Sequence, residues 1–89
     1  MNPDPEWDEA AYDALADIWV EATPEEREEF ERLVQRANRI LRDDPANVGE
    51  SRDGRDRVLI VEQLTFWFRL RPGPRALVFH IHRSRRRSP

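Results

Sequence analysis

The sequence predicts an α+β domain in which an N-terminal helical hairpin packs on an antiparallel sheet of three or four strands. Apolar residues recur every three or four positions across residues 11–41, which is the period of amphipathic helices. Across residues 57–82 the apolar residues alternate with polar ones or run together, as in strands. A chain of 89 residues supports a single core. We therefore expect residues 1–83 to form one domain and residues 84–89 a flexible, arginine-rich tail.

The two predicted helices have clear stripes and boundaries. The first helix, over residues 8–22, has the apolar stripe Ala11, Tyr12, Leu15, Ile18, Trp19 and Ala22. The second begins at Thr23, whose hydroxyl can cap the helix, with Pro24 at the first helical position and Glu26 completing a capping box. It ends near Asp43 and has the apolar stripe Phe30, Leu33, Val34, Ala37, Ile40 and Leu41. Two helices joined by so short a link form a hairpin that needs a sheet to cover.

Three apolar runs follow the polar loop PANVGESRDG and predict an antiparallel meander over residues 57–62, 64–71 and 76–82. In the second run, alternation directs toward the core Leu64, Phe66, Phe68 and Leu70. In the third run it directs toward the core Leu77, Phe79 and Ile81, with Val78, His80 and His82 on the opposite face. In the first run the residues at both alternating positions are apolar, so the sequence does not show which of them point toward the core.

Composition limits the class of protein. The chain has no cysteine, which excludes disulfides and thiolate metal sites and favours a cytoplasmic location. The first seven residues contain no apolar run, so we expect no secretory signal, and no later stretch approaches the length needed to span a bilayer, so we expect no membrane span.

Charge is distributed unevenly along the chain. Residues 1–50 hold fifteen acidic residues and five arginines, a net charge of −10, whereas residues 51–89 hold three acidic residues and ten arginines, a net charge of +7. Such polarity often accompanies binding of polyanions or of an acidic protein. The alternative is that the two halves attract each other.

The order of elements resembles the RelE/ParE toxin superfamily, the plasmid-stabilisation toxins of type II toxin–antitoxin systems. The segments that carry the resemblance are YDALADIW, RILRDDPANVGESR and LTFWFRL, and it extends from Trp7 to Arg83. It implies a RelE/ParE-like fold, growth inhibition and a cognate antitoxin partner. Members usually open with a strand ahead of the first helix, where Pro3 and Pro5 here allow at most a short edge strand. The ribonuclease branch generally has a basic residue near the position of Thr65.

For the ribonuclease branch the resemblance implies a metal-independent endoribonuclease, an mRNA interferase acting on the ribosome. A base removes the proton of a ribose 2′-hydroxyl, that oxygen attacks the adjacent phosphate, and cations stabilise the developing charge. Histidine suits the proton transfers because its unperturbed pKa is about 6.5. The catalytic candidates are His80, His82 and Arg69. The candidates for RNA binding, through arginine forks or base stacking, are Arg52, Arg55, Arg57, Trp67, Arg83 and Arg85.

Other interpretations stay open. One alternative is a ParE-type inhibitor of DNA gyrase, which binds without cutting, and another is an inactive member that retains only antitoxin binding. The structural alternative for these residues is that the histidines form a solvated strand face and the arginines flank a solvated turn. An HxH pair can ligate zinc, but no third ligand is in evident reach, so we predict no metal and no cofactor.

Overall fold

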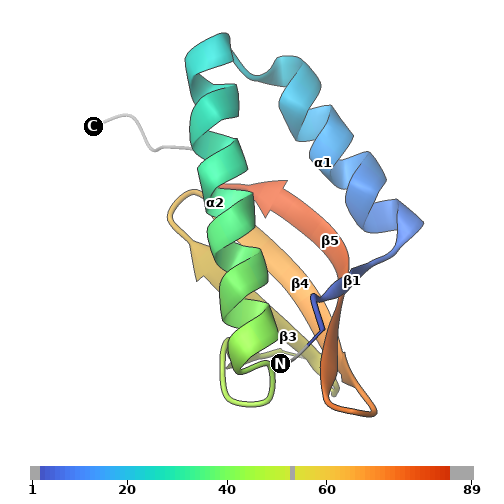
Figure 1. Ribbon diagram of the computed structural model, residues 1–89. Helices are drawn as coiled ribbons and strands as arrows, with labels where there is room; N and C mark the ends of the chain where they lie inside the picture. Colours follow the sequence, from blue (N-terminus) through green and yellow to red (C-terminus); the bar gives the residue numbers. More distant parts are fainter. Residues whose placement is uncertain (1–2, 53, 85–89) are drawn as a thin grey trace.

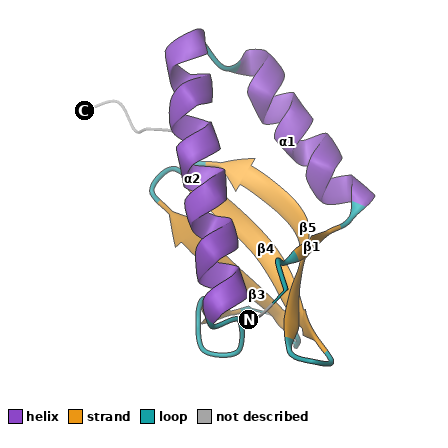
Figure 2. Cartoon of the chain, viewed as in Figure 1, coloured by secondary structure: helices purple, strands orange, loops and turns teal. Residues whose placement is uncertain are grey.

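The computed structural model describes residues 3–52 and 54–84, and over these residues two helices pack on a five-stranded mixed sheet (Figure 1). The α+β class is therefore confirmed. The elements are β1 (Glu6–Trp7), α1 (Glu9–Glu21), α2 (Pro24–Asp43), β2 (Glu50–Ser51), β3 (Asp56–Val61), β4 (Leu64–Arg71) and β5 (Arg75–Arg83). The spatial order is β1-β5-β4-β3-β2, with β1 parallel to β5 and all other pairs antiparallel. Both helices lie on the same face of the sheet (Figure 2).

The prediction of a purely antiparallel sheet of three or four strands was wrong about the two edge strands, β1 and β2. Glu6 and Trp7 pair in parallel with Leu77 and Val78, so β1 is the short edge strand that Pro3 and Pro5 permit. At the other edge, β2 lies inside the stretch predicted to be a loop and pairs with the start of β3. Each of these strands has two residues, too few to show an alternating pattern.

The helix boundaries follow local hydrogen bonds. The Asp8 side chain caps α1 by accepting from the N–H of Ala11 at 3.0 Å. The predicted capping box is present at α2, where Thr23 Oγ1 accepts from the N–H of Glu26 and Glu26 Oε1 accepts from the N–H of Thr23. From this link the two helices diverge, with α1 over β5 and α2 crossing β5, β4 and β3 (Figure 1). The predicted hairpin is therefore an open V.

The core lies between the helices and the face of the sheet beneath them, which we call the inner face. On α2 it contains Phe30, Leu33, Ala37 and Leu41, all buried. On the strands it contains Val61, Leu64, Phe66, Phe68, Ala76, Val78 and Ile81, also buried. The predicted inward positions of the second run are confirmed for Leu64, Phe66 and Phe68.

The third apolar run departs from simple alternation. Trp67 pairs with His80 and Phe68 pairs with Val78, so Phe79 is an extra residue in β5, a β-bulge. On the N-terminal side of the bulge the parity is reversed: Val78 is fully buried, whereas Leu77 and Phe79 are only half-buried. The expectation that Leu77 and Phe79 point into the core was therefore wrong, and Ile81, beyond the bulge, is buried as predicted.

The register of β3 settles the face that its sequence left open. Leu59 pairs with Phe66 and Val61 pairs with Leu64, so Leu59 and Val61 belong to the inner face. Val58 and Ile60 belong to the opposite face.

Candidate functional site

The candidate site is the outer face, the side of the sheet turned away from both helices (Figure 2). The cross-strand register arranges the side chains of this face in rows. One row consists of Val58, Trp67 and His80, and the next consists of Ile60, Thr65 and His82. A third row holds Asp56, Arg69 and Leu77. The ring of Phe79 also lies on this face, because it contacts the ring of Trp67 at 6.4 Å between centroids. Aromatic, imidazole and guanidinium groups thus share one surface.

Two adjacent imidazoles lie on β5, toward the edge of this face, where they line a cavity together with Asp17 and Glu21 of α1. The ring centroids of His80 and His82 are 5.9 Å apart, and both residues are exposed. The indole N–H of Trp67 donates to Nδ1 of His82 at 3.4 Å. Neutral His82 therefore carries its own proton on Nε2, pointing away from the indole. The predicted grouping of Trp67 with both histidines on one face is confirmed by the register.

Arg69 lies on the same face in a fixed position. Its Nε donates to Oδ1 of Asp56 at 2.6 Å, and its Cζ lies 4.8 Å from the centre of the Phe79 ring. The hydrogen bond and the charge of Asp56 raise the pKa of Arg69, so the guanidinium stays charged. The same carboxylate neutralises that charge locally, so a phosphate would have to compete with Asp56.

The other predicted arginines are not on this face. Arg57 pairs with Phe68 on the inner side, and its Nη1 donates to the carbonyl of Ala46 at 2.8 Å. Arg83 pairs with Leu64 on the inner side, where its Nη2 contacts Glu26 and its Cζ lies 5.0 Å from the Phe30 ring centre.

The remaining members of the predicted binding set lie at the ends of the sheet or beyond the described residues. Arg52 follows β2 and contacts Glu50 at 3.3 Å, and Arg55 lies exposed in the turn before β3. Of the predicted tail the structure describes only Ser84, whose N–H donates to the carbonyl of Gln63. Arg85 lies outside the described residues.

Sequence reasoning did not place Asp56, Leu77 and Phe79 in the site. The alternation pattern assigned Phe79 and Leu77 to the core because it cannot show a bulge. The sequence pattern predicted that the first strand begins at Arg57. The strand begins one residue earlier, at Asp56, and this allows Asp56 to pair with Arg69. Thr65, where the ribonuclease branch generally has a basic residue, is buried and pairs with His82.

Within residues 3–52 and 54–84, no three side chains of the His, Cys, Asp or Glu type lie close enough to hold a metal ion. In the same part of the chain, no helix combines the length and apolar character needed to cross a membrane. Comparison with protein-family models, curated proteins and solved structures found no match to this chain. The chemistry of the site therefore has to be argued from its own geometry.

Proposed function

We propose that the protein is the toxin of a type II toxin–antitoxin system of the RelE/ParE kind, and that its outer face cleaves mRNA without a metal. The observation that carries the proposal is the adjacency of two exposed imidazoles beside an aromatic surface and a fixed guanidinium. Histidine transfers protons near neutral pH and arginine stabilises a developing phosphate charge, so these groups suffice for attack by a 2′-hydroxyl.

The hydrogen bond from Trp67 assigns different roles to the two histidines. Nδ1 of His82 already accepts the indole N–H, so its remaining nitrogen is a donor, suited to the phosphate or to the leaving 5′ oxygen. No hydrogen bond engages the imidazole of His80 within the described residues, so His80 has a lone pair for the 2′-hydroxyl proton. Rings 5.9 Å apart can contact the same phosphodiester.

The apolar part of the face suits unpaired bases. Trp67 and Phe79 present ring surfaces in contact with each other, and Leu77 lies on the same side of β5. Aromatic rings bind unstacked bases with little sequence preference, at about 1–3 kcal/mol per base. Single-stranded RNA is the polymer that offers such bases beside a 2′-hydroxyl.

Two features of the fold agree with the proposed family. A two-residue strand precedes α1, where the superfamily usually has a strand, and an antiparallel run of β3, β4 and β5 follows the helices. The proposed location is the cytoplasm. The proposed partner besides RNA or the ribosome is an antitoxin, whose acidic residues would complement the arginine-rich C-terminal tail and would compete with Asp56 for Arg69.

One observation favours a second candidate function, binding without cleavage. Asp56 neutralises Arg69, Arg57 lies on the inner side, and Arg83, which lines a cavity with both imidazoles, contacts Glu26, so few unpaired cations remain beside them. The second candidate is therefore a ParE-type gyrase inhibitor, or an inactive member that retains antitoxin binding.

Induced expression in bacteria, with RNA cleavage mapping and growth curves, tests the proposal. We expect growth arrest with cleaved messages for the wild type, and loss of both for His80→Ala and His82→Ala. Arg36→Gln is a control substitution away from the outer face, because Arg36 lies on α2 and its one ion pair within the described residues is with Glu62. DNA damage with intact messages would favour gyrase inhibition. Unimpaired growth with well-folded protein would favour the inactive member.

A further inference from the structure

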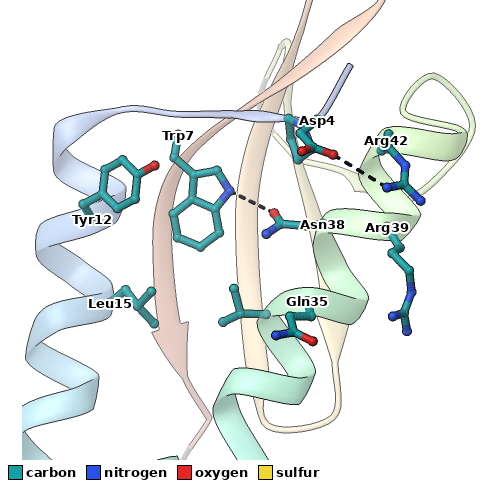
Figure 3. Close-up of a pocket in the computed structure, with 10 residues that line it drawn as sticks. Asp4, Trp7, Tyr12, Leu15, Gln35, Asn38, Arg39 and Arg42 are labelled. Carbon is teal, nitrogen blue, oxygen red and sulfur yellow. Dashed lines mark hydrogen bonds and ion pairs between the residues drawn. The ribbon is translucent and has the colours of Figure 1, made fainter. Parts of the chain in front are cut away.

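We propose that a second site, a cavity between the diverging helices, binds a compact aromatic carboxylate. The cavity has a volume of about 590 Å³ and lies on the inner side of the sheet between α1, α2 and the N-terminal segment (Figure 3). Volumes of this size are typical of small-molecule sites. Because none of its lining residues belongs to the outer face, the inference is independent of the proposed RNA chemistry.

One side of the cavity is apolar and incompletely covered. Trp7, Leu15 and Val34 line it and are half-buried, and Tyr12 is 60% exposed. The rings of Trp7 and Tyr12 lie 5.5 Å apart with 33° between their planes, which forms an aromatic wall. Figure 3 shows the indole of Trp7 in the space between the two helices. A ring inserted here would remove apolar surface from water.

The other side is rich in hydrogen-bond donors, which come from successive turns of α2. Asn38 Oδ1 accepts from the indole N–H of Trp7 at 3.0 Å. The NH₂ group of the same amide can therefore donate to a ligand. Arg39 lines the cavity, is exposed, and has no ion pair or hydrogen bond with any described residue. Gln35 lies one turn before it.

These donors favour a carboxylate over other head groups. A cation that bound to the aromatic wall would be repelled by Arg39, whereas the charge of Arg42, which also lines the cavity, is balanced by Asp4 and Asp43. Asp4, the acidic residue on the lining, contacts Arg42 at 3.7 Å and so does not oppose Arg39 directly. A planar carboxylate matches the guanidinium fork of Arg39, and a neutral amide would lose the charge-assisted part of that bond.

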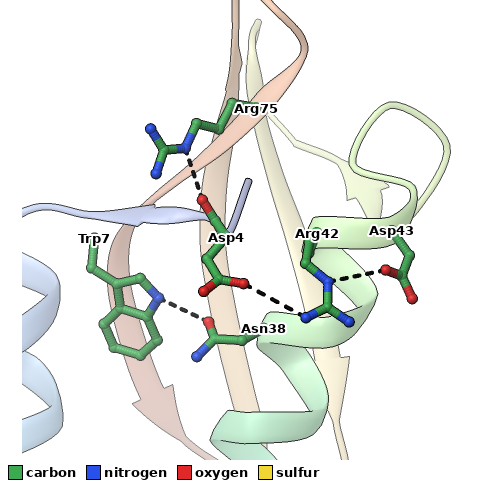
Figure 4. Close-up of polar contacts among 6 residues, drawn as sticks. All are labelled: Asp4, Trp7, Asn38, Arg42, Asp43 and Arg75. Carbon is green, nitrogen blue, oxygen red and sulfur yellow. Dashed lines mark hydrogen bonds and ion pairs between the residues drawn. The ribbon is translucent and has the colours of Figure 1, made fainter. Parts of the chain in front are cut away.

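The N-terminal segment limits the length of the ligand. Arg75 Nε donates to the carbonyl of Asp4 at 2.8 Å, and the Asp4 carboxylate contacts Arg42, so this segment is tied both to β5 and to α2 (Figure 4). The guanidinium groups of Arg71 and Arg75 also contact Glu6 at 3.7 and 3.5 Å. The segment crosses one end of the cavity (Figure 3), so a compact molecule fits better than a helix passing through.

Titration with 3-phenylpropionate, followed by the indole N–H resonances, tests the inference. The chain has three tryptophans. We expect the Trp7 resonance to shift with a dissociation constant of about 1 mM, and Trp67, on the outer face, to stay unchanged. The neutral probe 3-phenylpropionamide should bind about tenfold more weakly, since it lacks the charge.

Two variants distinguish specific binding in the cavity from nonspecific binding. Arg39→Gln should remove the preference for the acid over the amide, and Arg32→Gln, on the same helix outside the cavity, should retain it. Absence of binding, equal affinity for acid and amide in the wild type, or an unchanged preference in Arg39→Gln would each overturn the inference. None of these results bears on growth arrest or RNA cleavage, so the two proposals fail separately.

Discussion

The inner and outer faces of the sheet are formed by the same strands but are held together differently. On the inner face Phe66, Phe68 and Val78 are completely buried under the helices. On the outer face Val58 and Thr65 are buried but Ile60 is 54% exposed, and ring contacts and the Asp56–Arg69 ion pair replace a helical cover. The inner face therefore determines the fold through burial, and the outer face can change its chemistry at small cost in stability.

The largest expected difference between the faces concerns two phenylalanines. Phe66→Ala should lower the free energy of unfolding by about 3–5 kcal/mol, because it opens a cavity in the core. Phe79→Ala, at the bulge, should cost less than about 2 kcal/mol, because that ring is already partly in water. Urea unfolding followed by far-UV circular dichroism measures both. Equal losses would mean that the outer face contributes to the core as strongly as the inner face does.

The same bulge marks the limit of what the sequence predicted about the fold. Both helices, the capping box of α2 and the inward positions Leu64, Phe66 and Phe68 of β4 follow from local patterns that the chain carries in 8–41 and 64–71. A bulge adds a residue to one strand only, and its position depends on the partner strand, so alternation alone mispredicted Leu77 and Phe79. The two-residue strands depend on pairing with distant residues and have no pattern of their own.

The candidate site was predictable to a similar degree. Trp67, His80 and His82 were assigned to one face because alternation holds on the C-terminal side of the bulge. Arg57 and Arg83 fall on the inner side, at opposite ends of strands, where each finds a partner near a helix. Arginine has a long side chain that reaches such partners, and the sequence does not show which partner it meets.

The loop that supports the inner face provides the next prediction. Gly49 has φ +82°, and a Cβ there would lie 2.7 Å from the Val58 carbonyl oxygen and 2.9 Å from the Phe68 ring. Gly49→Ala should therefore destabilise the fold by about 2–4 kcal/mol, through backbone strain and overpacking. Gly54 has φ +55° but no described heavy atom within 4 Å of such a Cβ, so Gly54→Ala should cost only about 1 kcal/mol. Chemical denaturation compares them, and equal costs would exclude the steric part.

The link between the helices contributes less. Thr23→Ala removes the hydroxyl that accepts from the N–H of Glu26, so we expect a loss of about 1 kcal/mol. Thr23→Ser keeps the hydroxyl and serves as the control. Thermal unfolding should place the serine variant close to the wild type. A serine variant as unstable as the alanine variant would show that the threonine methyl group, and not the cap, supports the V-shaped pair above the inner face.

The smallest expected effect on stability concerns Arg83. The sequence predicted this arginine to bind RNA, but in the structure it lies on the inner side and contacts Glu26. The backbone N–H of Thr23 and the guanidinium of Arg83 hold the pKa of Glu26 below its ordinary value. The unfolded chain therefore takes up this proton at higher pH than the folded chain does. The stabilisation is complete above about pH 5 and is lost as pH falls through the lowered pKa.

Glu26→Gln should accordingly flatten the dependence of unfolding free energy on pH below about pH 5. Arg83→Gln should flatten it only partly, because the N–H of Thr23 still donates to the carboxylate. Arg69→Gln, on the outer face, leaves the surroundings of Glu26 unchanged and is the matched control for loss of an arginine. Denaturation curves across pH 3–7 measure the slopes. If the slope of Arg83→Gln equalled that of the wild type, the guanidinium would not act on Glu26, and Arg83 would be available to a partner in solution.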